Sequence, residues 1–233
     1  MEQSFTWLST LPFVHDHRVP ENAMASILVT LVLMGFAFFL RPRLSNIDQA
    51  VQPEDGVSAR NIGEQFVEMI SGIAEGVIGH HYERYVPLLA SFFAFILLSN
   101  LLGLLPGFSP PTANVNTTFA LGLVSFLAYN FYGLREGGLK YLKHFMGPML
   151  ILAPLMVFIE IMSHAFRPLS LGIRLFANMF ADHELISIFT GLTKIGVPVL
   201  FYCLGLLVCV VQAFVFTMLT AVYITLAVSH DEH

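Results

Sequence analysis

Charged residues are scarce in this sequence. Only 12% of its 233 residues are Asp, Glu, Lys or Arg, whereas a soluble domain carries about 25%. The 11 basic residues are too few and too scattered to form a nucleic-acid-binding patch. Apolar residues make up 56% of the chain, and the mean hydropathy is +0.73. These values exclude an ordinary soluble domain and predict an all-α integral membrane protein.

Cysteine is also scarce. Cys203 and Cys209 lie six positions apart within one apolar stretch, so we expect two buried small apolar side chains rather than a disulfide or a metal site. His183-Glu184 is not followed by the second histidine that zinc proteases carry at a fixed spacing. The sequence therefore predicts neither a metal nor a cofactor.

Long apolar stretches predict a single membrane domain over residues 1–233, with about five crossings. One crossing needs about 20 apolar residues. Residues 1–22 lack the early basic region of a signal peptide, and we expect them to form an outer-side segment ahead of a retained first crossing. The predicted elements are the first crossing at 23–40, an amphipathic interfacial helix at 58–84, the second and third crossings at 86–133, and two long helices at 146–228.

The predicted amphipathic helix at 58–84 has an acidic polar face. Its apolar residues recur at spacings of three and four, as in a helix that lies on a membrane surface. The opposite face carries Glu64, Glu68 and Glu75, which does not suit anionic lipid. We expect this helix to contact protein as well as lipid; a solvated acidic face is the alternative.

Basic residues indicate the orientation, because they accumulate on the cytoplasmic side. They cluster after the first and third predicted crossings, and the loop after the second crossing has none. The clusters are Arg41, Arg43, Arg60 and Arg84, and then Arg135, Lys140 and Lys143. The N-terminus is therefore expected outside, and the linker, the amphipathic helix and the C-terminus in the cytoplasm.

Residues 146–191 contain no polar loop. As a continuous helix they would be nearly 70 Å long, more than twice the roughly 30 Å thickness of a bilayer core. Arg167-Pro168 is too short a break for a turn, so we expect a bend there. Lys194-Ile-Gly-Val-Pro198 is expected to turn the chain into a second long helix, 199–228. Both helices must tilt strongly to fit in a membrane.

Arg174 lies deep in the first of these long helices and keeps its positive charge in any protein environment. Placing it in a membrane costs roughly 2.5–3.5 kcal/mol on insertion scales. Its helical neighbours three and four positions away are Ser170, Leu171, Ala177 and Asn178, and none is acidic. The sequence therefore predicts a partner farther away or on another chain.

Several polar residues share one side of this helix with Arg174. At 100° per residue, Glu160, Arg167 and Asn178 fall within roughly 40° of Arg174. Glu160 lies about 21 Å away along the axis, so we expect it to form a separate ionisable site rather than to act as the counter-ion of Arg174. His164 either belongs to that site or only packs against neighbouring helices. Asp182-His183-Glu184 ends the stripe, where a proton relay or channel lining is expected, and Gln212 on the last helix is placed to hydrogen-bond the arginine helix.

Three classes of membrane protein remain after this reading. An ion-translocating subunit that works with a partner explains the unpaired arginine. A secondary transporter predicts internal repeats and helices broken at mid-membrane, and neither is evident. An intramembrane enzyme needs a nucleophile and base or a metal, and no such constellation is seen. The first class is favoured.

Three motifs resemble those of one family. Arg167-Pro-Leu-Ser-Leu-Gly-Ile-Arg174 with residues 178–184 resembles the signature of subunit a of F-type ATP synthases. Asn100-Leu-Leu-Gly-Leu-Leu-Pro106 with residues 111–118 resembles a second marked stretch of that family, and Gln212 to Tyr223 resembles its C-terminal signature. The motifs occur in the expected order over essentially the whole chain.

The resemblance implies a stator subunit without catalytic chemistry of its own, in a bacterial inner membrane. It implies as partners a c-ring, peripheral-stalk b subunits, the rest of the synthase, lipid and protons. Arg174 matches the essential arginine that draws the proton off a c-ring carboxylate. Polar positions that line two aqueous half-channels or support the arginine are matched by Glu160, Ser170, Asn178 and Gln212.

One departure from the family pattern concerns the position nine residues after the arginine. Many relatives have one ionisable residue there, whereas this chain has His183 followed by Glu184, so both are candidates for the relay. The residue that some relatives pair with it is replaced by Gly205. The expected mechanism loads a c-ring carboxylate from the outer side through Glu160, His183 and Glu184, and releases the proton to the cytoplasm opposite Arg174.

Overall fold

The structure, a computed structural model, describes residues 20–44, 59–79, 81–144, 153–193 and 196–228. These residues form six α-helices and two short 3-10 helices, with no strand among the ranges given. The helices are α2 (Glu21–Leu44), α4 (Ala59–Ile78), η2 (Tyr82–Arg84), α5 (Val86–Leu102), η3 (Pro111–Ala113), α6 (Val115–His144), α7 (Ala153–Leu192) and α8 (Gly196–Val228). The all-α prediction is confirmed. Residues 1–19 of the predicted outer segment (1–22), residues 45–58 with the linker, the Lys194-Ile195 part of the turn and the tail 229–233 lie outside the described residues.

Four of the described helices are long and apolar enough to cross a membrane: α2, α6, α7 and α8. α5 is apolar but shorter, with 17 residues. The predicted crossings therefore correspond to helices in the structure. Several limits differ from the predicted ones: α2 extends beyond 23–40 at both ends, α6 runs past residue 133 to His144, and α8 begins at Gly196 instead of residue 199.

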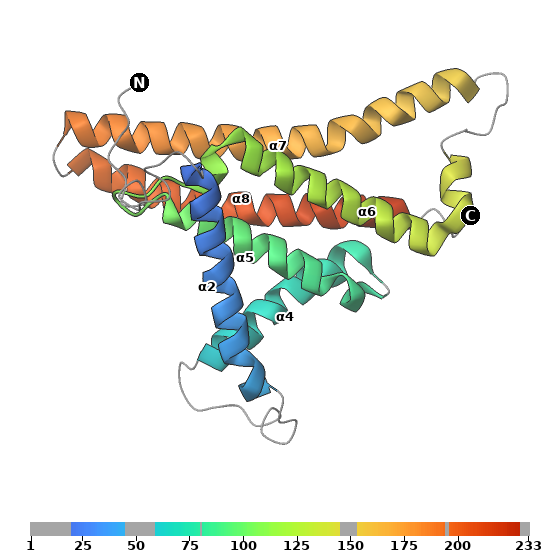
Figure 1. Cartoon of the computed structure of the whole chain (residues 1–233), viewed down its shortest axis with the longest axis horizontal. Helices are drawn as coiled ribbons and strands as arrows, with labels where there is room; N and C mark the ends of the chain where they lie inside the picture. Colours follow the sequence, from blue (N-terminus) through green and yellow to red (C-terminus); the bar gives the residue numbers. More distant parts are fainter. Residues whose placement is uncertain (1–19, 45–58, 80, 145–152, 194–195, 229–233) are drawn as a thin grey trace.

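α7 and α8 are the two long helices that the sequence predicts. They contain 40 and 33 residues, so each is longer than the roughly 30 Å of a bilayer core. Pro168 lies inside α7, and the ribbon of α7 bends partway along its length without a turn (Figure 1). α2 runs at a steep angle to α7 and α8 (Figure 1). A near-perpendicular first crossing and two strongly tilted helices would produce this arrangement.

The amphipathic helix is shorter than predicted. Its expected range was 58–84, but α4 ends at Ile78. Gly79 has φ +76° and His81 has φ +63°, and two left-handed residues so close together cannot continue a right-handed helix. The apolar face of α4 packs inward through Ile70 and Ala74. The acidic residues Glu68 and Glu75 are exposed.

Small residues let α6 and α7 approach closely. A Cβ atom added to Gly122 would lie 2.6 Å from the Pro168 carbonyl oxygen, and one added to Gly172 would lie 3.2 Å from the Thr118 carbonyl oxygen. Backbone contact through small residues is a common way to pack helices in membranes. It fixes the position of α7 just ahead of Arg174.

The core lies where α8 passes between α5, α6 and α7 (Figure 1). Phe92 of α5 stacks at an angle on Phe216 of α8, with ring centroids 5.5 Å apart. The Ser125 and Thr220 hydroxyls are 3.0 Å apart across the buried α6–α8 contact. This packing holds α8 against the arginine helix.

A polar contact ties α5 to the far end of α6. The Arg84 guanidinium and the Tyr85 hydroxyl both donate to Glu136 Oε1, at 2.6 Å and 2.8 Å. The pKa of the Tyr85 phenol is raised, mainly by burial and secondly by its hydrogen bond to Glu136. Arg84 and Arg135 are among the basic residues that the sequence predicts on the cytoplasmic side. This contact therefore lies at the end of the bundle for which that side is predicted.

Candidate functional site around Arg174

Arg174 lies at the edge of the exposed face of α7. Leu171 and Leu175 on one side of the helix are buried, at 2% and 0% exposure. Ile173 and Phe180 on the other side are about half exposed, at 47% each. The Arg174 side chain is itself exposed. Among the residues that the structure describes, no acidic side chain pairs with it, so the expectation of a partner elsewhere stays open.

One turn beyond Arg174, α7 and α8 are joined by a hydrogen bond between side chains. Asn178 Nδ2 donates to Gln212 Oε1 at 2.7 Å. Gln212 is 4% exposed. This confirms that Gln212 bonds the arginine helix, one turn from Arg174.

The sequence indicates Asp182 only as part of Asp182-His183-Glu184, and it does not predict the contact that Asp182 makes with α8. Asp182 lies two turns beyond Arg174, half-buried, against bare backbone on α8. A Cβ atom added to Gly205 would be 2.8 Å from Asp182 Oδ2 and 2.9 Å from Leu104 Cδ2. The space left by the missing Gly205 side chain is therefore filled by the Asp182 carboxylate. The sequence signal for this contact is the glycine at position 205, where some relatives carry an ionisable residue.

His183 and Glu184 follow Asp182 on different sides of α7. His183 is half-buried and Glu184 is exposed. Consecutive residues are about 100° apart around a helix, so these two side chains and that of Asp182 cannot share one direction. The structure therefore brings three titratable groups to one level of α7 without stacking them, and leaves the choice between His183 and Glu184 open.

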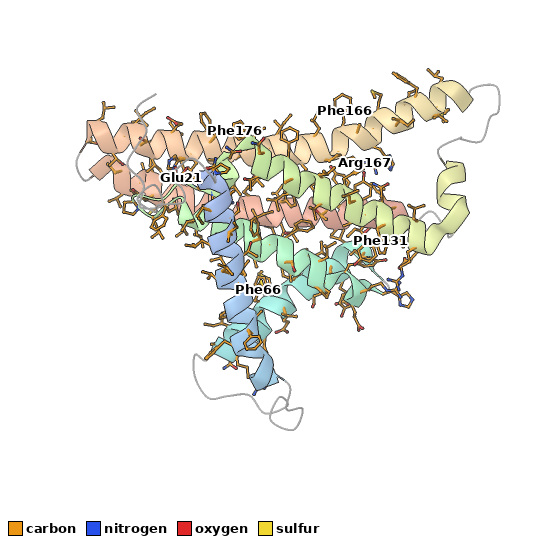
Figure 2. The ribbon with its side chains drawn as sticks, in the orientation of Figure 1. Glu21, Phe66, Phe131, Phe166, Arg167 and Phe176 are labelled. Atoms are coloured by element: carbon orange, nitrogen blue, oxygen red, sulfur yellow. The ribbon has the colours of Figure 1, made fainter. Side chains whose placement is uncertain are left out.

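The α7 segment before Arg174 carries a second polar group of residues. The Arg167 guanidinium lies over the Tyr223 ring of α8, 5.6 Å from its centroid. In Figure 2 Arg167 points toward α6 and α8, whereas Phe166 points away from them. Ser170 is exposed and donates to the Arg167 carbonyl at 3.0 Å. Arg167 is therefore half-buried, with its guanidinium against α8.

Glu160 lies far from Asp182, His183 and Glu184 along α7. Its backbone belongs to α7, while its side chain lies outside the described part of the chain. It precedes Arg174 by fourteen positions, whereas His183 follows Arg174 by nine. Glu160 and His183 are therefore about 35 Å apart along the axis, which places Arg174 between them.

The second motif forms a buried polar contact rather than part of the arginine site. The Thr112 hydroxyl donates to Asn100 Oδ1 at 2.7 Å, and Asn100 Nδ2 donates to the Cys209 carbonyl at 3.5 Å. The buried side chains of Asn100 and Thr112 therefore both have hydrogen-bond partners. Asn100 thus packs α5 against η3 and α8 through hydrogen bonds. The contact attaches η3 and α5 to α8 one turn before Gln212.

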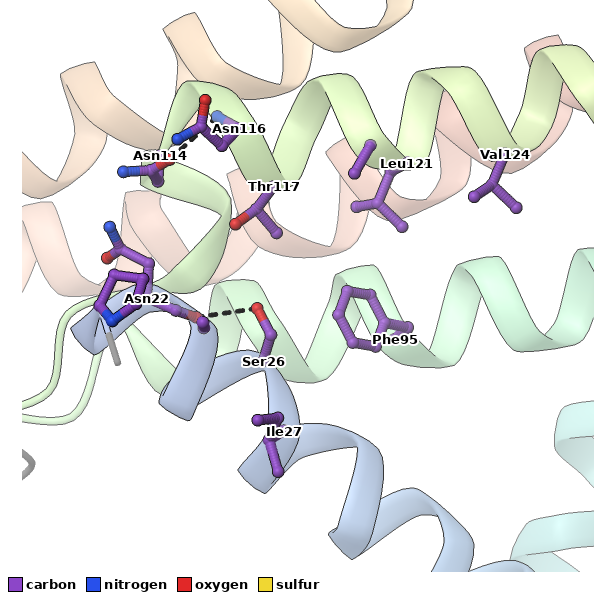
Figure 3. Close-up of a pocket in the computed structure, with 12 residues that line it drawn as sticks. Asn22, Ser26, Ile27, Phe95, Asn114, Asn116, Thr117, Leu121 and Val124 are labelled. Carbon is purple, nitrogen blue, oxygen red and sulfur yellow. Dashed lines mark hydrogen bonds between the residues drawn. The ribbon is translucent and has the colours of Figure 1, made fainter. Parts of the chain in front are cut away.

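A separate pocket of about 490 Å³ opens between α2, α5 and α6. Figure 3 shows Ser26 and Ile27 of α2 facing Leu121 and Val124 of α6, with Phe95 of α5 between them. Asn114 and Asn116 lie at its end. Its described lining contains no ionisable side chain, so it offers no proton-exchanging group.

Together these residues give α7 a fixed positive charge with titratable groups on both sides of it. An exposed cation attracts a carboxylate and favours its ionised form. Titratable side chains within a membrane are typical of proton pathways. The arrangement therefore suits the exchange of protons with a carboxylate that another molecule brings to the exposed face of α7.

Comparison with known proteins gives consistent matches over most of the chain. The family model described as ATP synthase A chain matches residues 23–225. The chain is 49% identical to ATP synthase subunit a of Bdellovibrio bacteriovorus over 229 residues, which cover 98% of this chain and 99% of that protein. It is 43% identical to ATP synthase subunit a 1 of Syntrophotalea carbinolica over 95% of this chain and 92% of the relative. It is 39% identical to ATP synthase subunit a of Sorangium cellulosum over 94% and 86%, respectively.

Proposed function

Because the chain belongs to the ATP synthase A chain family, we propose that it is the stator subunit that passes protons between two aqueous half-channels and a rotating c-ring. In this proposal the chain catalyses no ATP chemistry itself. Its partners are the c-ring, the b subunits of the peripheral stalk and the other subunits of the synthase. It lies in a bacterial inner membrane, with its N-terminus outside and its C-terminus in the cytoplasm.

The observation that carries this proposal is the exposure of Arg174 beside a large apolar surface. Phe166, Ile173 and Phe180 recur every seven residues on α7 and are 47–60% exposed. An apolar face of this kind suits lipid or a partner helix. A permanent charge at its edge suits a partner that carries a carboxylate, because neither lipid tails nor the described residues neutralise it.

Asp182, His183 and Glu184 form the outer half-channel in this account. They lie eight to ten positions beyond Arg174, about 12–15 Å along the helix axis. With the proposed orientation, α7 runs from the cytoplasmic side outward, so these residues lie between Arg174 and the outer surface. A proton that enters here protonates the c-ring carboxylate before the ring turns.

Glu160 and Ser170 belong to the inner half-channel. The sequence-based mechanism grouped Glu160 with His183 and Glu184 on the outer path. A continuous α7 puts Glu160 on the cytoplasmic side of Arg174 when His183 is on the outer side. We therefore assign Glu160 to the exit path. Arg174 separates the two paths, which opposes a direct proton leak, and draws the c-ring carboxylate into its ionised form.

Cysteine cross-linking in the complete synthase tests which surface meets the ring. In a background without Cys203 and Cys209, Ala177→Cys on the exposed side of α7 should cross-link to a cysteine placed beside the c-ring carboxylate. Leu175→Cys, which is buried, is the matched control and should not. No cross-link at residue 177, together with proton transport by the purified chain alone, would favour a secondary transporter instead.

A further inference from the structure

A second titratable residue of α7 shares a helix face with Asp182. His164 precedes Asp182 by eighteen positions, which is five complete helical turns, so the two point in the same direction around the axis. Asp182 meets Gly205 of α8 on this face. His164 lies on the other side of Arg174, ten positions before it. The packed face of α7 therefore carries one titratable group on each side of the arginine.

His164 lies in an aromatic cluster contributed by three helices. Its ring is 5.9 Å from that of Tyr129 of α6, at an interplanar angle of 56°. Tyr129 is 1% exposed, and its ring is also 5.9 Å from that of Tyr223 of α8. His164 Nδ1 is buried. These contacts hold the imidazole between α6 and α7 instead of leaving it in contact with lipid.

Two charged residues lie near His164 along α7. Arg167, three positions along the same helix, points into the same cluster over Tyr223. Residues three apart are neighbours on a helix surface, so this fixed positive charge lies beside the imidazole. Glu160 lies one turn away, on the side of His164 that is farther from Arg174. Tyr129 and Tyr223 are the titratable groups that α6 and α8 contribute.

We propose that His164 is a proton relay of the inner half-channel, held in place by Tyr129. This inference rests on the proposed function. One ring nitrogen accepts the proton that leaves the c-ring carboxylate through the water path past Ser170, and the imidazole then releases a proton toward Glu160 and the cytoplasm. No heavy-atom bond forms or breaks. The imidazole is suited to this task because its charge changes between about pH 5 and 8.

The test uses the complete synthase in liposomes, with ATP synthesis measured at a constant total driving force and varied inner pH. His164→Phe keeps an aromatic ring without a titratable group, and His164→Gln keeps polarity without one. We expect each variant to slow synthesis about a hundredfold, the low end of what a positioned proton-transfer group contributes. We also expect loss of the wild-type rate change between about pH 5 and 8, and partial rescue by added imidazole. Ser163→Ala, an exposed neighbour, should behave as wild type.

Co-purification of the c-ring establishes that each variant assembles. Wild-type rate and pH profile in either assembled variant would overturn the inference, as would failure of both to assemble, which would give His164 a structural role. An Arg174→Gln arm separates this inference from the proposed function. An inactive Arg174→Gln synthase with a wild-type His164→Phe synthase refutes only the relay; an active Arg174→Gln synthase refutes the proposed function.

Discussion

The side-chain amide of Asn178 donates a hydrogen bond to Gln212 across the α7–α8 contact, at 2.7 Å. The bond lies one turn from Arg174 and fixes the rotation of the arginine helix against its neighbour. Because Gln212 is buried, its oxygen has no alternative partner in water. The contact between α7 and α8 beside Arg174 is thus made by two neutral amides rather than by an ion pair.

This contact predicts that Asn178 and Gln212 act as a pair. Replacing Asn178 with Ala leaves the buried Gln212 amide without its partner, at a cost of about 1–3 kcal/mol, and replacing Gln212 with Ala removes the same contact from the exposed Asn178. We expect ATP synthesis to fall in each single variant and to fall little further in Asn178→Ala/Gln212→Ala, because the second change removes a group that is already unpaired. Strictly additive losses would show that the two residues act separately.

Gly122 should not tolerate a side chain. In Gly122→Ala the new Cβ would lie 2.6 Å from the Pro168 carbonyl oxygen, and the α7 backbone can respond only by moving. We expect overpacking to cost about 1–3 kcal/mol, seen as a lower thermal unfolding temperature of the subunit in the detergent-solubilised complex. Gly35→Ala is the matched control, since nothing lies within 4 Å of its added Cβ and alanine favours the helix by up to about 1 kcal/mol. Equal behaviour of the two variants would rule out the close contact.

The contact between Asp182 and Gly205 predicts how the outer path responds to a small change. Gly205→Ala would place a methyl group 2.8 Å from Asp182 Oδ2 and so displace the carboxylate, and Asp182→Asn would remove its charge. We expect both variants to assemble and to synthesise ATP more slowly. Asp182→Ala/Gly205→Ala relieves the conflict with the carboxylate but leaves the Leu104 methyl group 2.9 Å from the added Cβ, so its stability should recover in part while its synthesis stays low. Recovery of synthesis in that double variant would show that the carboxylate serves only packing.

The sequence predicts the elements that depend on a strong local signal. A charge that cannot be neutralised, placed inside a long apolar run, located the site at Arg174 before any contact was known. Helix length against bilayer thickness predicted that residues 146–228 form two overlong helices. The Gln212 bond was predicted because few strong polar groups occur on the last helix.

Other features depend on contacts that a single sequence does not encode visibly. Asp182 gains its position from the rotation of α8, which brings Gly205 opposite the carboxylate. The end of α4 depends on left-handed backbone at Gly79 and His81, although the apolar periodicity continues past them. The mechanism expected from the sequence placed Glu160 and His183 on one outer path. A continuous α7 in the predicted orientation would instead have these two residues on opposite sides of Arg174.

The central claim is that Arg174 acts on a carboxylate of the c-ring. The most direct measurement is ATP synthesis driven by a proton gradient, in liposomes that contain the complete synthase with Arg174→Gln. Glutamine keeps hydrogen-bonding capacity but removes the charge. Arg135→Gln, an exposed arginine at the end of α6, is the matched control and should retain synthesis. The account predicts an assembled Arg174→Gln complex that makes no ATP above background; synthesis at the wild-type rate would contradict it.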